Sequence, residues 1–481
     1  MGKSLSRALT GIIVFAYGLF TIALYSLSSL SKGTYFKRPT EKEKLELQLA
    51  RDRLWNLSKD FEGLSHHLLT LQSGFKFHFL SNDTPNTPET IDSGKPLVIF
   101  IHGFPDSWAI WRHIVKNPAL QKAVSIVAID LPGYGGTDSL EKYNATNVLE
   151  KLTELIVTLR TQYGVDTDVE SNKKKTVIVA HDWGCVLSMR LAAEAPSLAH
   201  RFILSNGPSL IVQMKLVESN IRRLLFSSNK MLGNAWRNPL QARAPLTQAL
   251  RTISPLLRQI FLSGYIFAMQ LPIPLVNYFL TGGNLSLLRG IHIKSHGTAE
   301  FSAQDKAESM ASSMGPSVAE SKTKTANGDS YPDTLQDERA FAHIIHMANY
   351  YRHHASTARW TKSIETVASL HSITPGAGRA SSGAGLFNEG PPGALKASTT
   401  VFWGKEDLAL DPRICLDGMS DFLVQGSQVV LLPRTGHWTP VEVESRAALI
   451  KAVEWTVQGE KGDIGAALET SYPGVQVTFS R

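Results

Sequence analysis

The sequence predicts an α/β protein in which helices cover both faces of a mostly parallel sheet, with an inserted helical cap and an apolar N-terminal helix. Three observations support this prediction. Short apolar runs alternate with helical stretches up to Asn206, the alternation then stops for a long interval, and it resumes at Thr399. Continuous apolar runs of this kind are typical of parallel strands buried on both faces. The expected strands are Phe75–Leu80, Leu97–Ile101, Val124–Ile129, Thr176–His181, Arg201–Ser205, Thr399–Trp403 and Gln428–Leu432.

The composition fits a chain with a large buried core. Of the 481 residues, 43% are hydrophobic and 19% are charged, which excludes wholesale disorder and a collagen-like structure. The net charge is +7, from 49 Lys and Arg against 42 Asp and Glu. The two cysteines, Cys185 and Cys415, are too few for a disulfide framework and lack the spacing of a metal site.

An uncharged stretch from Ala8 to Ser31 predicts a membrane-spanning helix. As a helix, Leu9 to Leu30 would extend about 33 Å, which is enough to cross the hydrocarbon core of a bilayer. We interpret the stretch as an uncleaved anchor, because it is longer than the apolar core of a signal peptide and no A-x-A site follows it. The alternative is a cleaved signal peptide, since small residues follow the run.

The charges that flank this anchor predict its orientation. Lys3 and Arg7 precede it, whereas Lys32, Lys37, Arg38, Lys42 and Lys44 follow it. The positive-inside rule favours a cytosolic main domain, and we expect a single-pass protein of the endoplasmic reticulum. The four sequons would carry glycans only in the opposite orientation, and they begin at Asn56, Asn82, Asn144 and Asn284.

The patterns divide the chain into four parts. We expect an anchor and an amphipathic linker helix over 1–66, the first part of the core over 67–206, the cap over 207–372 and the second part of the core over 373–481. Within the cap, 295–338 is rich in Ser, Ala, Lys and acidic residues. Because it has few large apolar groups, we expect it to be disordered.

A second segment also has the composition of irregular structure. Thr374–Ala397 is rich in Gly, Pro and Ser and is expected to form an extended loop before the strand at Thr399.

The stretch Thr176–Cys185 carries the most informative motif. An apolar strand ends in a turn where the small residues Ala180 and Gly184 flank Asp182, and a helix follows. This pattern is typical of a nucleophile elbow, a sharp turn that lifts one side chain above a sheet and brings backbones close together. A carboxylate there is already ionised near neutral pH and can displace a leaving group at a saturated carbon, which forms an ester. The alternative is that Asp182 only caps the following helix.

Two further residues complete a catalytic order. Asp407 follows the strand Thr399–Trp403, and His437 follows the last expected strand. The chain order nucleophile, acid and base is that of hydrolases built on such an elbow. His437 would take a proton from water to cleave the ester, while Asp407 would hold the imidazole in the correct tautomer. Glu406 and Asp411 are alternative acids, but the position directly after the strand favours Asp407.

A Gly/Pro turn with the sequence HGFP begins at His102, directly after the strand Leu97–Ile101. Backbone N–H groups in such a turn can face the elbow. We expect those of Phe104 and Trp183 to form an oxyanion hole for ester cleavage. Considered as structure alone, the turn is an ordinary strand end.

Together, these motifs resemble the α/β-hydrolase-fold epoxide hydrolases, from about Phe75 to Val457. The resemblance is carried by His102-Gly103-Phe104-Pro105, Asp130-Leu131-Pro132-Gly133-Tyr134-Gly135, His181-Asp182-Trp183-Gly184, Asp407 and Gly436-His437-Trp438. It implies the α/β-hydrolase fold and the hydrolysis of an epoxide to a vicinal diol through an aspartyl ester. The elbow is shared with haloalkane and fluoroacetate dehalogenases.

Two cap tyrosines separate these relatives. Epoxide hydrolases of this family use such a pair on the ring oxygen, and the segments around Tyr265 and Tyr351 resemble those that carry the pair. An epoxide leaves as a strongly basic alkoxide, which needs an acid such as a phenol, whereas a halide needs only a weak donor. Tyr350 is the alternative to Tyr351, about 100° round the same helix.

We therefore expect a membrane-anchored epoxide hydrolase that acts on a lipophilic epoxide, such as an epoxidised fatty acid, without cofactor or metal. The alternatives are a haloalkane or haloacid dehalogenase with the same Asp182 nucleophile, and a catalytically silent, membrane-tethered binding module. A cluster of His343, His346, His353 and His354 suggests zinc, but no Cys or carboxylate completes a ligand set. The sequence contains no nucleic-acid-binding module.

The early cap concentrates positive charge. Eight basic residues stand against one acid, Glu218, and they are Lys215, Arg222, Arg223, Lys230, Arg237, Arg243, Arg251 and Arg258. We expect them to contact anionic lipid headgroups, and a solvated helix face is the alternative.

Overall fold

The computed structural model describes residues 2–166, 174–208, 210–297, 300–335, 344–374 and 393–479. In these residues, nine strands form one sheet in the order β1-β2-β4-β3-β5-β6-β7-β8-β9. Strands β3 to β8 are parallel to their neighbours within that set, whereas β1, β2 and β9 pair antiparallel at the two edges. The strands are β1 Ser65–Thr70, β2 Lys76–Ser81, β3 Leu97–Ile101, β4 Ser125–Ile129, β5 Thr176–His181, β6 Arg201–Ser205, β7 Thr399–Gly404, β8 Gln428–Leu432 and β9 Gln476–Phe479.

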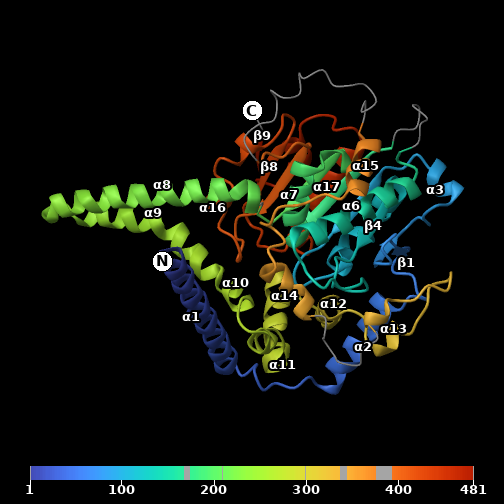
Figure 1. Cartoon of the computed structure of the whole chain (residues 1–481), viewed down its shortest axis with the longest axis horizontal. Coiled ribbons are helices and arrows are strands. Elements are labelled where there is room, and N and C mark those ends of the chain that lie inside the picture. Colours follow the sequence, from blue (N-terminus) through green and yellow to red (C-terminus); the bar gives the residue numbers. More distant parts are fainter. Residues whose placement is uncertain are drawn as a thin grey trace.

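Helices connect the strands and fill the long interval between β6 and β7 (Figure 1). The helices of the core and N-terminus are α1 Gly2–Ser31, α2 Glu41–Trp55, α3 Pro88–Asp92, α4 Arg112–Val115, α5 Pro118–Ala123, α6 Ala145–Gln162, α7 Trp183–Glu194, α16 Pro412–Cys415, α17 Val443–Val457 and α18 Ile464–Glu469. Those between β6 and β7 are α8 Leu210–Arg237, α9 Arg243–Leu262, α10 Gly264–Met269, α11 Ile273–Ser295, α12 Ala303–Met314, α13 Val318–Ser321, α14 Ile344–Arg352 and α15 Ile364–Ser372.

Strand β3 shows why both faces of the sheet need helices. Successive side chains of a strand point to opposite faces. Leu97, Ile99 and Ile101 enter one hydrophobic core and Val98 and Phe100 enter the other, and all five are fully buried. Helices α6 and α7 line the first core, and α17 lines the second. This is the layered α/β arrangement that the sequence predicts.

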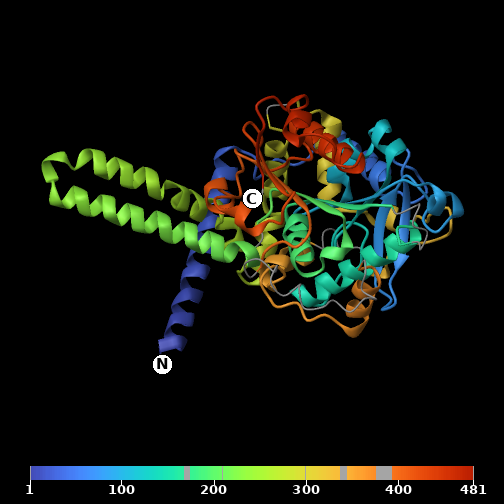
Figure 2. The ribbon, with the colours of Figure 1, turned by 90° about the horizontal axis from the view of Figure 1, so that it is seen from above.

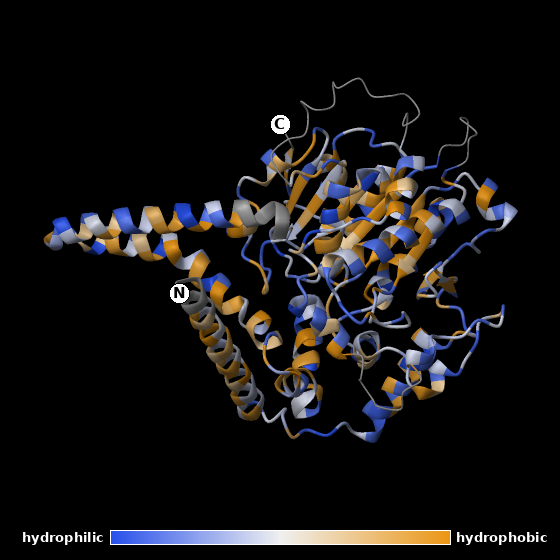
Figure 3. Cartoon of the chain, viewed as in Figure 1, coloured by the Kyte–Doolittle hydropathy of each residue, from blue (hydrophilic) through white to orange (hydrophobic). Residues whose placement is uncertain are grey.

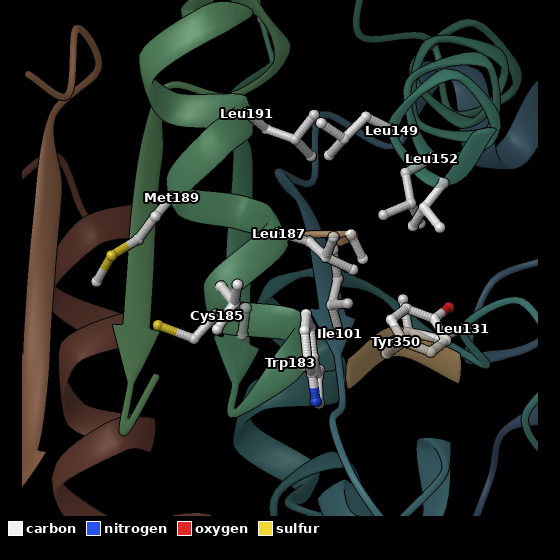
Figure 4. Packing of buried hydrophobic residues seen from close by; sticks show 14 of the residues in the cluster. Ile101, Leu131, Leu149, Leu152, Trp183, Cys185, Leu187, Met189, Leu191 and Tyr350 are labelled. Atoms are coloured by element: carbon white, nitrogen blue, oxygen red, sulfur yellow. The ribbon is translucent and has the colours of Figure 1, made fainter. Parts of the chain in front are cut away.

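The first core continues from the sheet into the cap (Figure 4). Leu191 of α7 lies beside Leu149 of α6, as expected for helices that share one face of the sheet. Lower on α7, the ring centroid of Trp183 lies 5.5 Å from that of Tyr350 in α14. A cap helix therefore packs directly against the start of α7.

The N-terminal segment differs from the prediction at its end. Thr40 and Glu43 form a reciprocal capping box at the start of α2, but the helix ends at Trp55 rather than near His66. His66 lies in β1, which pairs with β2. The sheet therefore begins inside the part expected to be linker helix, because strand pairing adds an edge that the apolar pattern does not show.

The predicted disorder of 295–338 is wrong for the residues of this segment that the structure describes. Two helices, α12 and α13, form there. Ala311 is completely buried, and its carbonyl oxygen accepts a hydrogen bond of 2.9 Å from Trp55 Nε1. Small side chains let backbones approach closely, so a segment with few large apolar groups still packs against α2 and the core. Residues 336–338 lie outside the described residues.

Two other predictions fall mainly outside the described residues. Most of the loop expected at Thr374–Ala397 is not described, since the structure omits 375–392. His343, one member of the histidine cluster, is also outside the described residues.

Two elements leave the globular body (Figures 1 and 2). The first is α1. Among the described residues, its part Ala8–Ser31 is the one single helix that is long and apolar enough to cross a membrane. Its second half packs on the cap, where Ile22 is buried, and Figure 3 shows the helix as largely hydrophobic. The second is a long hairpin formed by α8 and α9.

Candidate active site

Asp182 lies on the turn between β5 and α7, as the elbow motif predicts. Its backbone has φ 50° and ψ −117°, a positive-φ conformation that a residue with a side chain rarely adopts. A Cβ at position Gly184 would lie 2.4 Å from Ile101 O and 2.5 Å from His102 O. Position 184 therefore requires glycine, and the close approach of backbones is the reason that the sequence motif implies.

The structure brings together the three residues predicted to act on the ester. Asp182 Oδ2 lies 3.5 Å from His437 Nε2. On the other side of the imidazole, His437 Nδ1 lies 2.9 Å from Asp407 Oδ2. All three follow the carboxyl ends of parallel strands, and such ends meet at one edge of a sheet. The imidazole of His437 thus lies between the two carboxylates, as expected for a base between a nucleophile and an acid.

Asp407, and not either alternative acid, contacts the histidine. Its carboxylate is completely buried, and Oδ1 accepts backbone hydrogen bonds from Ala409 (2.6 Å) and Leu410 (2.9 Å). Glu406 is exposed. Asp411 is buried but pairs with arginines, including Arg258 at 3.1 Å. The acid is therefore held in place by its own loop.

The turn after β3 faces the elbow. The N–H of Phe104 donates a hydrogen bond of 2.7 Å to Asp182 Oδ1. A Cβ at Gly103 would lie 2.5 Å from the backbone nitrogen of Trp183, so the turn packs tightly on the start of α7. The amide of Phe104 thus contacts the Asp182 carboxyl group, and the amide of Trp183 lies against the same turn, where an oxyanion hole is predicted.

The cap brings Tyr265 of α10 and Tyr351 of α14 together. Their ring centroids are 5.7 Å apart in an edge-to-face arrangement. The ring of Tyr351 also contacts Trp183 (4.9 Å) and Phe104 (5.6 Å), the two residues whose amides are predicted to form the oxyanion hole. In contrast, the hydroxyl of Tyr350 donates to the carbonyl oxygen of Pro132 at 2.9 Å. The structure therefore favours Tyr351 over Tyr350 as the second tyrosine.

The charges around Asp182 and His437 favour an ion pair. Burial alone would lower the pKa of His437, but the charge of Asp407 and hydrogen bonds to Asp182 and Asp407 outweigh it and raise that pKa. Burial would raise the pKa of Asp182, but the hydrogen bond and charge of His437 and the Phe104 N–H lower it. Both shifts favour the ionised forms, which are a carboxylate on Asp182 and an imidazolium on His437.

Both cap phenols are neutral at physiological pH. Burial, followed by the charge of Asp182, raises the pKa of Tyr265. Burial, followed by Tyr265 and Asp182, also raises the pKa of Tyr351. Since an unperturbed tyrosine already titrates near pH 10, both side chains keep their protons and can donate them.

The sequence analysis missed several residues that support these groups. Asn206, at the end of β6, donates from Nδ2 to Asp407 Oδ2 at 2.7 Å. His181 Nε2 donates to the backbone oxygen of His437 at 2.9 Å. Arg352 donates to Met269 O at 2.6 Å and so ties the tyrosine-bearing helices α14 and α10 together. The position of Asn206 directly after a core strand, like that of Asp407, is the signal that could have identified it.

The comparison with protein families agrees with this geometry. The sequence model described as "Alpha/beta hydrolase family" matches residues 98–452, which include Asp182, Asp407 and His437. The chain therefore belongs to the alpha/beta hydrolase family. The predicted α/β-hydrolase fold is confirmed.

Two of the curated proteins that this chain resembles are epoxide hydrolases. The chain is 28% identical over 159 residues to epoxide hydrolase 3 of Mus musculus, which is 33% of this chain and 38% of that protein. It is 26% identical over 159 residues to epoxide hydrolase 4 of Homo sapiens, covering 32% and 38%. The matches thus span well under half of those relatives. They confirm the resemblance to the epoxide hydrolases that the motifs indicate.

Solved structures show the same fold. A crystal structure of a variant of aCif superposes with a TM-score of 0.50 at 14% identity, covering 87% of this chain and 96% of that one.

Proposed function

We propose that this protein is an epoxide hydrolase that converts an epoxide and water into a vicinal diol through an ester on Asp182. The observation that carries the proposal is the elbow carboxylate beside the His437–Asp407 pair, together with two adjoining cap phenols. The epoxide hydrolases among the relatives support the same activity. The phenols argue against a dehalogenase, since a halide leaves without needing a proton.

The first step opens the ring. Oδ1 of Asp182 is held by the Phe104 N–H, which leaves Oδ2 as the attacking atom. As Oδ2 bonds to one ring carbon, the bond from that carbon to the ring oxygen breaks. The oxygen becomes an alkoxide, and Tyr265 and Tyr351 supply a proton and a hydrogen bond to it. The product of this step is a hydroxyalkyl ester of Asp182.

The second step cleaves the ester. Esterification removes the negative charge of Asp182, which is one cause of the raised pKa of His437. The imidazolium then gives its proton, directly or through water, to the tyrosinate that ring opening left in the cap. The neutral Nε2 can now take a proton from the attacking water. The water oxygen attacks the ester carbonyl carbon, and the amides of Phe104 and Trp183 stabilise the oxyanion. The bond from the carbonyl carbon to the diol oxygen breaks, and the departing alkoxide takes a proton from His437. The carboxyl group formed on Asp182 returns a proton to the imidazole, which restores the carboxylate beside an imidazolium.

Oxygen labelling tests the ester. With the full chain in excess over styrene oxide in oxygen-18 water, the first diol should contain an unlabelled oxygen from Asp182. Direct attack by water would place oxygen-18 in that diol and would overturn the proposal. His437→Gln should form the ester and then stall, which intact-protein mass spectrometry would detect.

Tyrosine variants test the assignment of the acid. Because a positioned acid or base contributes about 10²–10⁴-fold, we expect a loss of this order in ring opening when both Tyr265 and Tyr351 are replaced by Phe. Tyr350→Phe is the matched control and should retain ring opening. Halide release from a chlorinated or fluorinated acid, without diol from styrene oxide, would instead identify a dehalogenase.

We also propose that α1 anchors the enzyme in the endoplasmic reticulum with the hydrolase domain in the cytosol, and that its substrate is lipophilic. Asn82, the first residue of a sequon, supports this orientation, because its Nδ2 donates to Gln121 O (2.8 Å) and Val124 O (3.0 Å), and a glycan on Nδ2 would remove at least one of these hydrogen bonds. Protein made in eukaryotic cells should show no mobility shift with an endoglycosidase. A shift would reverse the proposed orientation, and equal turnover of styrene oxide and an epoxidised fatty acid would refute the lipophilic substrate.

A further inference from the structure

The hairpin of α8 and α9 exposes large apolar side chains. The two helices pack against each other along a seam that includes the buried residues Ser228, Ala235 and Ala249. Across this seam, Ser228 Oγ donates to Ala249 O at 3.3 Å. Away from the seam, large apolar residues are 39% exposed or more, and they are Leu225, Phe226, Leu232, Trp236, Leu240, Leu246, Leu250, Leu257, Ile260 and Phe261.

Most of these residues lie on one face of the hairpin. In α8, Leu225, Leu232 and Trp236 recur at spacings of seven and four, and in α9 Leu246, Leu250 and Leu257 recur at four and seven, so each set forms a stripe. Each stripe lies roughly 100° from the seam, in the direction of increasing residue number. Because the two helices are antiparallel, this rotation turns both stripes to the same side.

The other face of the hairpin is basic. Lys230 of α8 and Arg251 of α9 are exposed and lie on the side away from the stripes. Arg223 lies on the same side and pairs with Asp417 at 2.6 Å. No acidic residue occurs between Glu218 and Glu300. The hairpin thus combines an apolar face with a side that carries exposed basic residues, which is the pattern of helices that lie in a membrane interface.

The apolar face continues toward α1. Ile260, near the end of α9, accepts a hydrogen bond of 2.8 Å at its carbonyl oxygen from the hydroxyl of Tyr17. Leu9, Ile12 and Ile13 of α1 are likewise more than half exposed. Exposed hydrophobic surface therefore extends from the hairpin to the proposed anchor, and Figure 3 shows hydrophobic residues along both elements.

We propose that the α8–α9 hairpin is a second membrane-binding element, which lies in the bilayer surface with its apolar face among the acyl chains. This inference rests on the proposed anchoring of α1 in one respect, which is that the anchor brings the hairpin close to the bilayer. Anionic lipid headgroups complement the basic residues. A second copy of the chain, packed on the apolar face, is the alternative occupant, and the labelling experiment distinguishes it from lipid.

Environment-sensitive labels on single cysteines can test this geometry in the full chain. Cys185 and Cys415 are both buried, so an introduced exposed cysteine should react selectively in the folded protein. NBD is attached at Leu232→Cys or Leu250→Cys on the apolar face, and at Asn234→Cys or Gln248→Cys as matched controls on the other side. The protein is reconstituted into phosphatidylcholine and phosphatidylserine vesicles, with and without brominated acyl chains.

We expect brominated lipid to quench the labels at Leu232 and Leu250 about twofold and to leave the two controls unchanged. Equal quenching at all four sites, or none at Leu232 and Leu250, would overturn the proposal. If the labels at positions 232 and 250 became shielded from solvent as protein concentration rises, but were not quenched by brominated lipid, the proposal would also be overturned. That result would show that a second copy of the chain covers the apolar face.

A label at Ile13→Cys separates this proposal from the anchoring of α1. Quenching at Leu250 without quenching at Ile13 would refute the anchor and support the hairpin. The reverse result would refute the hairpin and support the anchor.

Discussion

Helix α12 and the α8–α9 hairpin differ in opposite directions from what their compositions suggest. The segment containing α12 has few large apolar groups, yet Ala311 and Ser312 are completely buried. The hairpin is rich in leucine, yet Leu250 and Leu257 are 57% and 54% exposed. Apolar content thus failed to predict burial in both regions of the cap.

The difference shows what each segment packs against. In α12, Glu308 accepts a hydrogen bond of 3.1 Å from Arg112 Nε, and Ser312 Oγ lies 2.9 Å from Ser107 Oγ, just after the turn that carries Phe104. Specific polar partners and small side chains therefore bury α12 inside the protein. The hairpin has no such partners on its apolar face among the described residues, which is consistent with a partner outside the chain.

Removal of the Glu308 carboxylate should have the largest effect. Glu308→Ala leaves Arg112, which is 2% exposed, without its main counter-charge. Breaking a buried pair by removing one partner typically costs about 3–5 kcal/mol, and we expect a fall of this size in the free energy of unfolding. Urea denaturation of the full chain in mild detergent measures it.

Lys306→Ala on the exposed side of α12 is the control, and it should change stability by less than about 0.5 kcal/mol. If Glu308→Ala were as mild as this control, α12 would contribute no specific packing and the comparison would fail.

Replacement of hairpin leucines should have the smallest effect on stability. Leu250→Gln and Leu257→Gln should each change the free energy of unfolding by less than about 0.5 kcal/mol, because these side chains are already exposed within the chain. In the same variants, binding of the hairpin to vesicles should weaken. Leu280→Gln, at a completely buried position, is the control and should cost roughly 2 kcal/mol or more. A loss of that size at Leu250 would show that the protein itself covers the hairpin.

The core strands could be predicted closely from the sequence. The expected bounds of β3, β5, β6 and β8 agree with the structure. Strands β3, β5 and β6 are buried on both faces, as continuous apolar runs predict, whereas β8 alternates buried and partly buried residues. Strands β1 and β9 were not predicted. The residues of β9 are mostly exposed, and β1 includes two histidines, so pairing with a neighbour forms these strands rather than apolar content.

The residues of the candidate site could be predicted where a short motif specifies both the turn after a strand and the reactive side chain on that turn. Asp182, Asp407 and His437 follow core strands, and the strand order brings them together. The contacts of Asn206 with Asp407 and of Ser312 with Ser107 join residues far apart in the sequence. Such contacts depend on tertiary packing, and a local pattern does not contain them.

At position 182, the residues that fix the turn are different from the side chain that the turn presents. A Cβ at Gly207 would lie 2.4 Å from the carbonyl oxygen of Asp182, much as one at Gly184 would strike the strand end beside it. The side chain of residue 182 itself points away from these crowded backbones toward the imidazole. Evolution can therefore exchange the reacting group, for example carboxylate for hydroxyl, while the two glycines must stay, so one scaffold can acquire new reactions through a single codon.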